Sequence, residues 1–273
     1  MSDRFAGRRA VVTGSSRGIG AGIAQRLAAE GADVVLVART LEATDEMPGS
    51  LRQTQAICER YGTAVGCVAA DLSDDIARSG VIPRARDILG GPIDILVNNA
   101  AAAIAYPITE VTPAQQRLAY ECNVIAPLGL AQAAIPDMRQ AGAGWIVNLT
   151  SVGARLPEGP PFYLGPPGST MELYGATKAA LNRLTSGLAG DLYGSGIRVN
   201  AVGPGVAVMS EGFADLIGDQ LPAELFESVE EIVEAVTALC DCPADVTGRV
   251  FSSLDLIDEW ALSVRGLDGL ARV

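Results

Sequence analysis

The 273-residue chain contains no histidine. Histidine is the side chain whose unperturbed pKa of about 6.5 suits proton transfer at neutral pH. Its absence excludes Ser-His-Asp hydrolysis, Cys-His proteolysis and His-ligated metal chemistry. Any catalysis must therefore use other proton carriers, and we expect no metal site.

Cysteine is scarce, and long apolar runs are missing. The five cysteines are irregularly spaced, and Cys240 and Cys242, one residue apart, match no common zinc or redox motif. The N-terminal sequence MSDRFAGRRA does not resemble a signal peptide, and no run of about 18 apolar residues predicts a transmembrane helix. We therefore expect a cytoplasmic protein with reduced cysteines and no membrane segment.

Basic residues are fewer than acidic ones. Twenty lysines and arginines stand against 32 aspartates and glutamates, which gives a net charge of −12. Such a surface repels phosphate backbones and anionic lipid, so we expect neither nucleic acid nor a membrane as a partner. With 49 % hydrophobic and 19 % charged residues, the composition is that of a folded chain with a substantial core.

Short β-branched runs alternate with longer helical segments, a pattern typical of a parallel sheet with helices on both faces. The runs are almost continuously apolar, as strands buried on both faces should be. We expect strands at Ala10–Thr13, Asp33–Ala38, Val65–Ala69, Ile93–Val97, Trp145–Leu149, Arg198–Val202 and Arg249–Phe251. The sequence thus predicts an α/β fold of the Rossmann type, a doubly wound parallel sheet of about seven strands in a single domain spanning residues 1–273.

Local signals mark helix starts and long loops. Capping boxes at Thr112–Gln115 and Ser228–Glu231 each predict the first turn of a helix. Two segments interrupt the alternation, at 40–50 and at about 153–173, and the second is rich in proline and glycine. Long loops inside a domain are often lids or binding loops.

The first predicted strand runs into the glycine-rich stretch TGSSRGIG (13–20), which is followed by a helical sequence. Glycines permit a sharp turn and a close backbone approach, and a helix N-terminus supplies positive potential. The strand–loop–helix order favours a dinucleotide pyrophosphate over an ordinary glycine turn. The residues expected to bind the cofactor here are Gly14, Ser16, Arg17, Gly18, Ile19 and Gly20.

The second predicted strand lacks an acid at its end, where a carboxylate would hold a ribose 2′-hydroxyl. Arg39 stands there instead, and together with Arg17 it could neutralise a 2′-phosphate. This favours NADP, with NAD still possible. The alternative is a pair of solvated surface arginines.

Tyr174 and Lys178, in the stretch YGATK, are spaced i, i+4 and share one helix face. Free tyrosine has a pKa of about 10, too high for a base at neutral pH. A neighbouring ammonium and a bound oxidised nicotinamide would both favour the phenolate. The pair could therefore replace histidine as the acid and base, although a plain helix-surface pair has the same spacing.

Taken together, these motifs resemble those of the short-chain dehydrogenase/reductase family. The resemblance runs from Arg9 to about Phe251. Its motifs, in order, are TGSSRGIG, Asp71-Leu72, Asn98-Asn99-Ala100-Ala101, Asn123, Ser151, YGATK and Pro204-Gly205. Each motif is weak alone, and Asn123, Ser151 and Asp71 could each be ordinary backbone-bonding or capping residues.

The resemblance implies a role for each residue. Tyr174 would exchange a proton with the substrate oxygen, and Ser151 would hydrogen-bond that oxygen. Lys178 would hold the nicotinamide ribose and lower the pKa of the tyrosine, and Asn123 would anchor a water linked to the lysine. The residues implied to contact the adenine, ribose and nicotinamide are Asp71, Leu72, Asn98, Ala100, Pro204, Gly205 and Val206.

The sequence departs from the family pattern in three places. Ser151 and Tyr174 are 23 positions apart, wider than usual, so the inserted residues should loop out beside the site. There Phe162, Tyr163 and Leu164 could wall the substrate pocket or cover a neighbouring subunit. Where the family often has a threonine after Pro204-Gly205, this chain has Met209 and Ser210, and SSLDLIDEWAL replaces the frequent Asp-Gly-Gly near the C-terminus.

The segment from about 206 to 227, which closes over the substrate in this family, is largely apolar. Its apolar residues include Val208, Met209, Phe213, Leu216 and Ile217. An apolar lid predicts a fairly apolar substrate, although a buried amphipathic helix would look the same.

We therefore expect an oxidoreductase that transfers a hydride between NADP(H) and a secondary alcohol or ketone. One alternative is a 3-oxoacyl thioester reductase of the same family, and another is a non-catalytic NADP-binding sensor. Segments 112–141 and 174–194 carry many small residues. By resemblance, they suit the interfaces of a homodimer or homotetramer.

Overall fold

The continuously apolar runs form a parallel sheet of seven strands in the order β3-β2-β1-β4-β5-β6-β9. The computed structural model describes residues 3–43, 49–162, 171–208 and 226–272. The strands are β1 (Arg9–Thr13), β2 (Asp33–Ala38), β3 (Val65–Ala69), β4 (Ile95–Asn98), β5 (Gly144–Leu149), β6 (Ile197–Gly203) and β9 (Val250–Ser252). All seven predicted strands are confirmed, and no end differs by more than about two residues.

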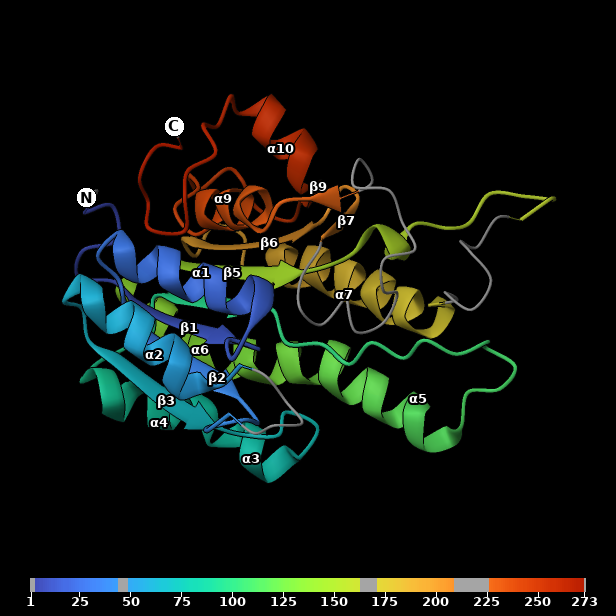
Figure 1. Cartoon of the computed structure of the whole chain (residues 1–273), viewed down its shortest axis with the longest axis horizontal. Coiled ribbons are helices and arrows are strands. Elements are labelled where there is room, and N and C mark those ends of the chain that lie inside the picture. Colours follow the sequence, from blue (N-terminus) through green and yellow to red (C-terminus); the bar gives the residue numbers. More distant parts are fainter. Residues whose placement is uncertain (1–2, 44–48, 163–170, 209–225, 273) are drawn as a thin grey trace.

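Helices cover both faces of the sheet (Figure 1). One face carries α1 (Gly18–Ala29), α2 (Leu51–Cys58), α9 (Val229–Leu239) and α10 (Ser253–Glu259). The other carries α4 (Val81–Leu89), α6 (Ala126–Ala141) and α7 (Glu172–Asp191). The shorter α3 (Asp75–Ser79) and α5 (Pro113–Tyr120) flank the second layer. Single turns lie at η1 (Glu59–Tyr61), η2 (Glu121–Ile125) and η3 (Val152–Ala154). The predicted doubly wound α/β fold is confirmed.

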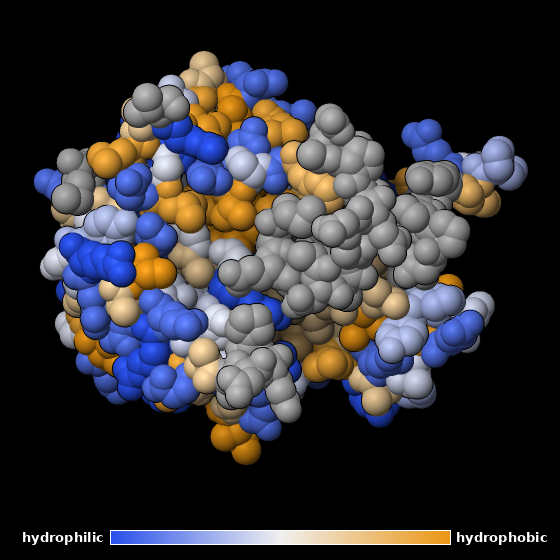
Figure 2. Space-filling view, in the orientation of Figure 1, coloured by the Kyte–Doolittle hydropathy of each residue, from blue (hydrophilic) through white to orange (hydrophobic). Residues whose placement is uncertain are grey.

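The strands feed two separate hydrophobic cores. Ala10 and Val12 of β1 pack into the core under α1 and α9, whereas Val11 between them packs under α4 and α6. Successive side chains of a strand point to opposite faces, so both faces must be apolar for both layers to pack. This explains why the strand sequences do not alternate in polarity. On the molecular surface, hydrophilic side chains cover α2 and apolar ones emerge between α1 and α9 (Figure 2).

Both capping boxes are present, with Thr112 paired to Gln115 and Ser228 to Glu231. The first begins the continuous helical stretch Pro113–Ala141, which comprises α5, η2 and α6. By length and mean hydropathy alone this stretch could cross a membrane. Half of its most apolar window is buried in the protein, however, and core helices of α/β folds meet the same test.

A second, very small sheet was not predicted. β7 (Ala207–Val208) and β8 (Phe226–Glu227) form a parallel pair in which Ala207 lies opposite Phe226 and Val208 opposite Glu227. Two residues give no readable hydrophobic pattern, so the sequence offered no signal for either strand. The pair brings together the two ends of segment 209–225.

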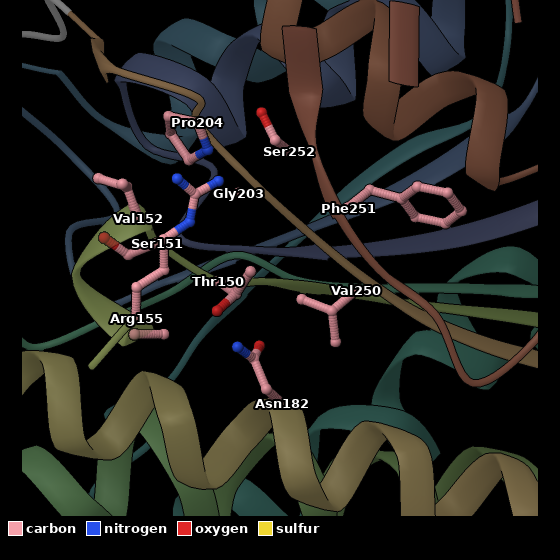
Figure 3. Close-up of a pocket in the computed structure, with 11 residues that line it drawn as sticks. Thr150, Ser151, Val152, Arg155, Asn182, Gly203, Pro204, Val250, Phe251 and Ser252 are labelled. Carbon is pink, nitrogen blue, oxygen red and sulfur yellow. The ribbon is translucent and has the colours of Figure 1, made fainter. Parts of the chain in front are cut away.

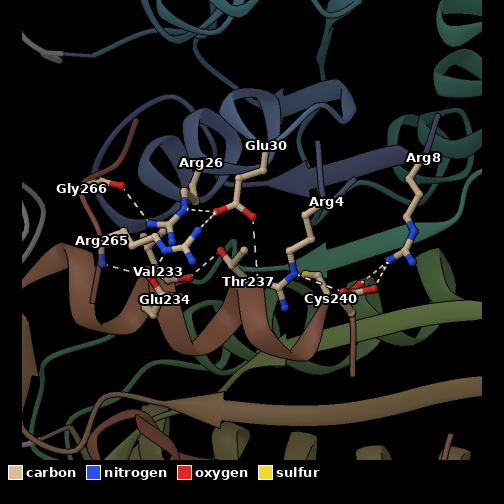
Figure 4. Close-up of polar contacts among 11 residues, drawn as sticks. Arg4, Arg8, Arg26, Glu30, Val233, Glu234, Thr237, Cys240, Arg265 and Gly266 are labelled. Carbon is tan, nitrogen blue, oxygen red and sulfur yellow. Dashed lines mark hydrogen bonds and ion pairs between the residues drawn. The ribbon is translucent and has the colours of Figure 1, made fainter. Parts of the chain in front are cut away.

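The chain after α10 is attached to α1 and α9 by a buried ionic cluster (Figure 4). Arg26 of α1 is fully buried and pairs with Glu30, at 2.6 Å, and with Glu234 of α9. Its third nitrogen donates to the carbonyl of Gly266 at 2.9 Å. The backbone N–H of Arg265 in turn donates to Glu234 at 3.1 Å. The C-terminal segment thus completes the cluster.

Candidate active site

A cleft of about 520 Å³ opens at the carboxyl ends of the strands, beside the point where the strand order reverses between β1 and β4. This is where doubly wound sheets bind their ligands. The loops that follow β1, β2, β3 and β4 line it. Of the residues predicted to bind the cofactor, ten lie on its wall: Gly14, Ser16, Arg17, Gly18, Ile19, Gly20, Arg39, Asp71, Leu72 and Ala100.

The glycine loop is built for an anion. Gly14 and Gly18 have φ values of +67° and +57°, which favour glycine. A Cβ on Gly20 would lie 2.2 Å from the carbonyl oxygen of Gly14, so only glycine lets the start of α1 pack against the loop. No side chain caps α1, and its first turn carries no acid. Its first N–H groups and the positive end of its dipole are therefore available to a phosphate, so the loop fits a dinucleotide.

The two neighbouring asparagines Asn98 and Asn99 lie in different surroundings, and the predicted contact of Asn98 with the cofactor ribose stays a prediction. Asn98 is 2 % exposed, and its amide donates to Asn148 on β5 at 2.9 Å. Asn99 lines the cleft, and its amide donates to the carbonyl of Thr13 at 2.8 Å. The Thr13 hydroxyl accepts from the N–H groups of Asn99 and Ala100. Asn98 ends β4 with its side chain bonded to the neighbouring strand, so only its backbone can face the cleft.

Arg39 is exposed at the cleft beside Asp71. The Asp71 carboxylate accepts from the hydroxyl and the N–H of Ser73, at 2.7 and 2.9 Å. These bonds, with a smaller contribution from the charge of Arg39, hold the pKa of Asp71 below its usual value. Asp71 is therefore a fixed anion, and Arg39 and Arg17 place positive charge in the same cleft.

Three of the four predicted catalytic residues meet at the ends of β5 and α7. Lys178 is 2 % exposed, and its Nζ donates to the carbonyl of Leu149 at 2.6 Å. It lies 5.5 Å from the ring centre of Tyr174, whose hydroxyl shares a hydrogen bond with Ser151. Burial lowers the pKa of Lys178 to about 8. Ser151, Tyr174 and Lys178 therefore lie together at the carboxyl end of β5.

Among the chain's own groups the pKa of Tyr174 is raised, and the lowered pKa expected in the presence of oxidised nicotinamide stays a prediction. Burial raises it to about 12, and the hydrogen bond from Ser151 opposes that rise only in part. Desolvation disfavours the charged phenolate relative to the neutral phenol. In these residues alone the phenol therefore keeps its proton at neutral pH.

Asn123, the fourth predicted catalytic residue, is fully buried within the π-helical turn η2. Its side-chain oxygen accepts from Ala102 N at 2.8 Å, and its amide nitrogen donates to Ala102 O and to the Thr177 hydroxyl. Thr177 also donates to the carbonyl of Tyr174. Asn123 thus ties the cleft loop to α7, and its side chain makes no recorded bond to Lys178 within the described residues.

A smaller cavity of about 140 Å³ adjoins Ser151 and Pro204 (Figure 3). Thr150 and Asn182 face one another across it, and the side-chain oxygen of each is buried without a partner in the described part of the chain. Among the described residues that line it, Arg155 is the only charged one. Buried oxygens of this kind are commonly satisfied by ordered water.

Beside loop 204–206, which the resemblance implies would contact the nicotinamide, lies a buried acid that the sequence did not indicate. The N–H of Gly205 donates to the carboxylate of Glu227 at 2.9 Å. Burial raises the pKa of Glu227, while hydrogen bonds from Ser253, Gly205 and Val206 oppose the rise. Glu227 had been placed at the end of the apolar closing segment, where nothing in the local pattern marks a buried acid.

Of the three departures from the family pattern, the insertion before Tyr174 and the change after Pro204-Gly205 lie partly outside the described residues. Residues 155–162 extend away from the body of the protein (Figure 1), and Phe162 is 62 % exposed. Phe162 therefore walls neither cavity. Other predicted residues lie outside the described residues: Tyr163, Leu164, Met209, Ser210, Phe213, Leu216 and Ile217.

Comparisons with known proteins agree with this geometry. A family model described as short chain dehydrogenase matches residues 8–216. Gluconate 5-dehydrogenase of Gluconobacter oxydans (strain 621H) is 35 % identical over 244 residues, covering 86 % of this chain and 88 % of that protein. Two solved structures share the fold over almost the whole chain.

L-Sorbose reductase from Gluconobacter frateurii, complexed with NADPH and L-sorbose, matches with a TM-score of 0.77 at 29 % identity, covering 92 % of this chain and 97 % of that one. The 3-oxoacyl (acyl-carrier-protein) reductase from Agrobacterium tumefaciens C58, with NADP bound, gives 0.75 at 30 % identity, covering 91 % and 93 %. Motifs, fold and relatives converge, and this chain belongs to the short-chain dehydrogenase/reductase family.

Proposed function

We propose that the chain is an NADP-preferring oxidoreductase that interconverts a secondary alcohol and a ketone. The observation that carries the proposal is the set of Ser151, Tyr174 and Lys178: two hydroxyls that hydrogen-bond each other beside a buried amine. Bound NADP(H) supplies or accepts the hydride. The chain's own residues orient the substrate and move its proton.

The protonation states favour reduction at neutral pH. The Tyr174 phenol, with its pKa of about 12, holds a proton that it can donate to the oxygen of a reacting carbonyl. The Ser151 hydroxyl can donate a hydrogen bond to that oxygen as negative charge develops there. Lys178, with a pKa of about 8, can exchange protons near neutrality. Oxidation needs the phenolate, so its rate should rise with pH.

The cofactor proposal rests on Arg39 at the end of β2, where an NAD-binding protein of this fold would place an acid. The two solved relatives that carry NADP or NADPH support it. Asp71 is the one acid among the described residues of the cleft wall. It follows β3 rather than β2, and its carboxylate accepts a hydrogen bond from the Ser73 hydroxyl.

For the substrate, we propose a polyhydroxylated ketone or alcohol as the first class to test. Relatives named for gluconate and L-sorbose favour it. The apolar substrate expected from the sequence stays a prediction, because most of the side chains behind it lie outside the described residues. A 3-oxoacyl thioester is the second candidate, favoured by the solved reductase of that name.

The test follows absorbance of reduced nicotinamide with gluconate, L-sorbose, apolar ketones and an acetoacetyl thioester. We expect NADP(H)-linked turnover, and Tyr174→Phe should lower it by about 10²–10⁴-fold while retaining cofactor binding. Turnover restricted to the thioester would shift the function to the second candidate. Tight cofactor binding without turnover on any carbonyl would instead indicate a sensor.

We also propose a cytoplasmic homodimer or homotetramer. Small residues at Gly129, Ala133, Gly187 and Gly190 on α6 and α7 are at least partly exposed and would allow close helix packing between subunits. Light scattering coupled to size-exclusion chromatography distinguishes these states from a monomer.

A further inference from the structure

Glu227 is a buried carboxylate that lies beside loop 204–206. It is 3 % exposed, and its partners within the described residues are hydrogen-bond donors rather than cations. An acid buried without a countercharge is costly to keep. Its position therefore calls for an explanation.

The donors come from two separate parts of the chain. Gly205 N lies 2.9 Å from Oε2 of Glu227, and Val206 contributes a second backbone N–H. The hydroxyl of Ser253, at the start of α10, lies 2.8 and 2.7 Å from the two carboxylate oxygens. Gly205 N also lies 3.2 Å from that hydroxyl. Glu227 thus joins the loop after β6 to α10.

The backbone of loop 204–206 packs closely against the residues that begin α10. A Cβ on Gly205 would lie 2.9 Å from the Ser252 hydroxyl and 3.3 Å from Leu254. The loop backbone is therefore pressed against the start of α10, and Glu227 fixes it from the other side. Through its pairing with Val208, the backbone of Glu227 also holds β7, which follows the loop.

We propose that Glu227 is a positioning residue for hydride transfer. By accepting the N–H groups of Gly205 and Val206, its carboxylate sets where loop 204–206 stands against the nicotinamide. This inference rests on the proposed function, because that loop has a reacting group to orient only in an NADP(H)-dependent enzyme. A misplacement of about 1 Å can cost 10²-fold in rate.

The experiment compares Glu227→Gln with Glu231→Gln in single-turnover reduction of the ketone that the wild type reduces fastest. Glu231 lies four residues away and caps α9, where glutamine caps equally well, and it makes no recorded bond to the loop. Glutamine at 227 keeps the shape but presents an NH₂ group to backbone N–H donors. The readouts are the single-turnover rate of hydride transfer, the primary deuterium isotope effect on the steady-state kcat, and the Kd of NADPH.

We expect Glu227→Gln to slow hydride transfer by about 10²-fold and to raise the isotope effect, with the Kd of NADPH little changed. Glu231→Gln should match the wild type. Ser253→Ala, which removes one donor but keeps the carboxylate, should give a smaller loss. If Glu227→Gln does not fold, the same three readouts are measured in Ser253→Ala and Glu227→Asp.

A wild-type rate and isotope effect in folded Glu227→Gln would overturn this inference while leaving the proposed function intact. So would an activity loss that only follows the unfolded fraction. A wild-type protein without any NADP(H)-linked turnover would overturn both.

Discussion

At the scale of single residues, the chemistry depends on groups whose surroundings shift their protonation. Lys178, the only lysine in the sequence, is buried with one backbone carbonyl as its hydrogen-bond acceptor. Its amine has lost most of its hydration without gaining a carboxylate partner in the described residues. The same burial that tunes the amine for proton exchange also destabilises the fold.

We expect Lys178→Met to stabilise the protein at pH 7. The pKa of Lys178 falls from 10.5 to about 8 on folding, so below pH 8 folding carries the full cost of burying its charge. That cost disappears as the pH rises from 8 to 10.5, where the folded amine is already neutral. Allowing for the lost hydrogen bond, the gain in unfolding free energy should be about 2 kcal/mol at pH 7 and near zero at pH 10.5.

Urea unfolding of wild type and variant at both pH values checks this gain. Because the chain has a single lysine, ¹³C-lysine labelling gives one side-chain signal whose titration midpoint should lie near 8. A midpoint near 10.5 would contradict the prediction, as would a variant less stable than wild type at pH 7.

Arg39→Ala should weaken NADPH binding by about 10–100-fold, because a charge-assisted hydrogen bond contributes roughly 1.5–3 kcal/mol. NADH has no 2′-phosphate, so its binding should change little. Titrations of both cofactors give the ratio, and Arg139→Ala, an exposed arginine at the end of α6, is the control. Equal losses for both cofactors, or a wild type that prefers NADH, would reverse the assignment.

Two things about single residues could not be predicted from the sequence. One is which of two adjacent side chains faces the cleft, and the other is which distant residues a buried side chain contacts. The sequence marked Asn98 and Asn99 as one motif, but it could not show that the Asn98 side chain is buried against β5 while Asn99 lines the cleft. Glu227 could not be recognised because its partners Gly205 and Ser253 lie 22 and 26 residues away. Only the folded chain brings them together.

At the scale of elements, the strands and capped helices were readable because their signals are local. Strands buried on both faces are continuous apolar runs, and a capping box spans four residues. The π-helical turn at Asn123 and the pair β7–β8 had no such signal. The glycine loop, in contrast, was readable from composition and order alone.

Gly20→Ala tests that loop as an element. The added methyl would lie 2.2 Å from the carbonyl of Gly14, so the loop must shift away from α1. We expect cofactor affinity to fall more than tenfold, about 1.4 kcal/mol or more, as measured by NADPH titration. Gly80→Ala, between α3 and α4, meets only ordinary contacts at 3.6 Å or more and should bind NADPH normally, with unfolding free energy raised by about 0.4–1 kcal/mol. Normal cofactor binding by Gly20→Ala would show that the close contact does not shape the site.

At the scale of the whole molecule, the C-terminal segment had no readable role in the sequence. The structure gives it one, since Arg265 and Gly266 complete the polar surroundings of Arg26 and Glu234. The sequence separations of these contacts are 31, 208 and 240 residues, so two of the three join opposite ends of the chain. A local sequence pattern cannot indicate contacts of this length, so the ionic cluster could not be predicted from the sequence.

Arg26→Met should destabilise the protein by about 3 kcal/mol, because it leaves Glu30 and Glu234 buried without their main partner. Replacing all three residues, with Glu30→Gln and Glu234→Gln added, should recover much of the loss. Urea unfolding measures both. A single variant as stable as wild type would mean that Arg4 and Arg265, which lie 3.8 and 4.0 Å from Glu30, are sufficient.

The parallel pair β7–β8 has a consequence for how the protein can diversify. Because Ala207 and Val208 pair with Phe226 and Glu227, the described residues on either side of segment 209–225 are held by each other. Changing the number of residues between two fixed points of a chain costs little closure entropy. Exchange of this segment between relatives as a cassette should therefore alter which alcohols are accepted while the cofactor cleft stays as it is.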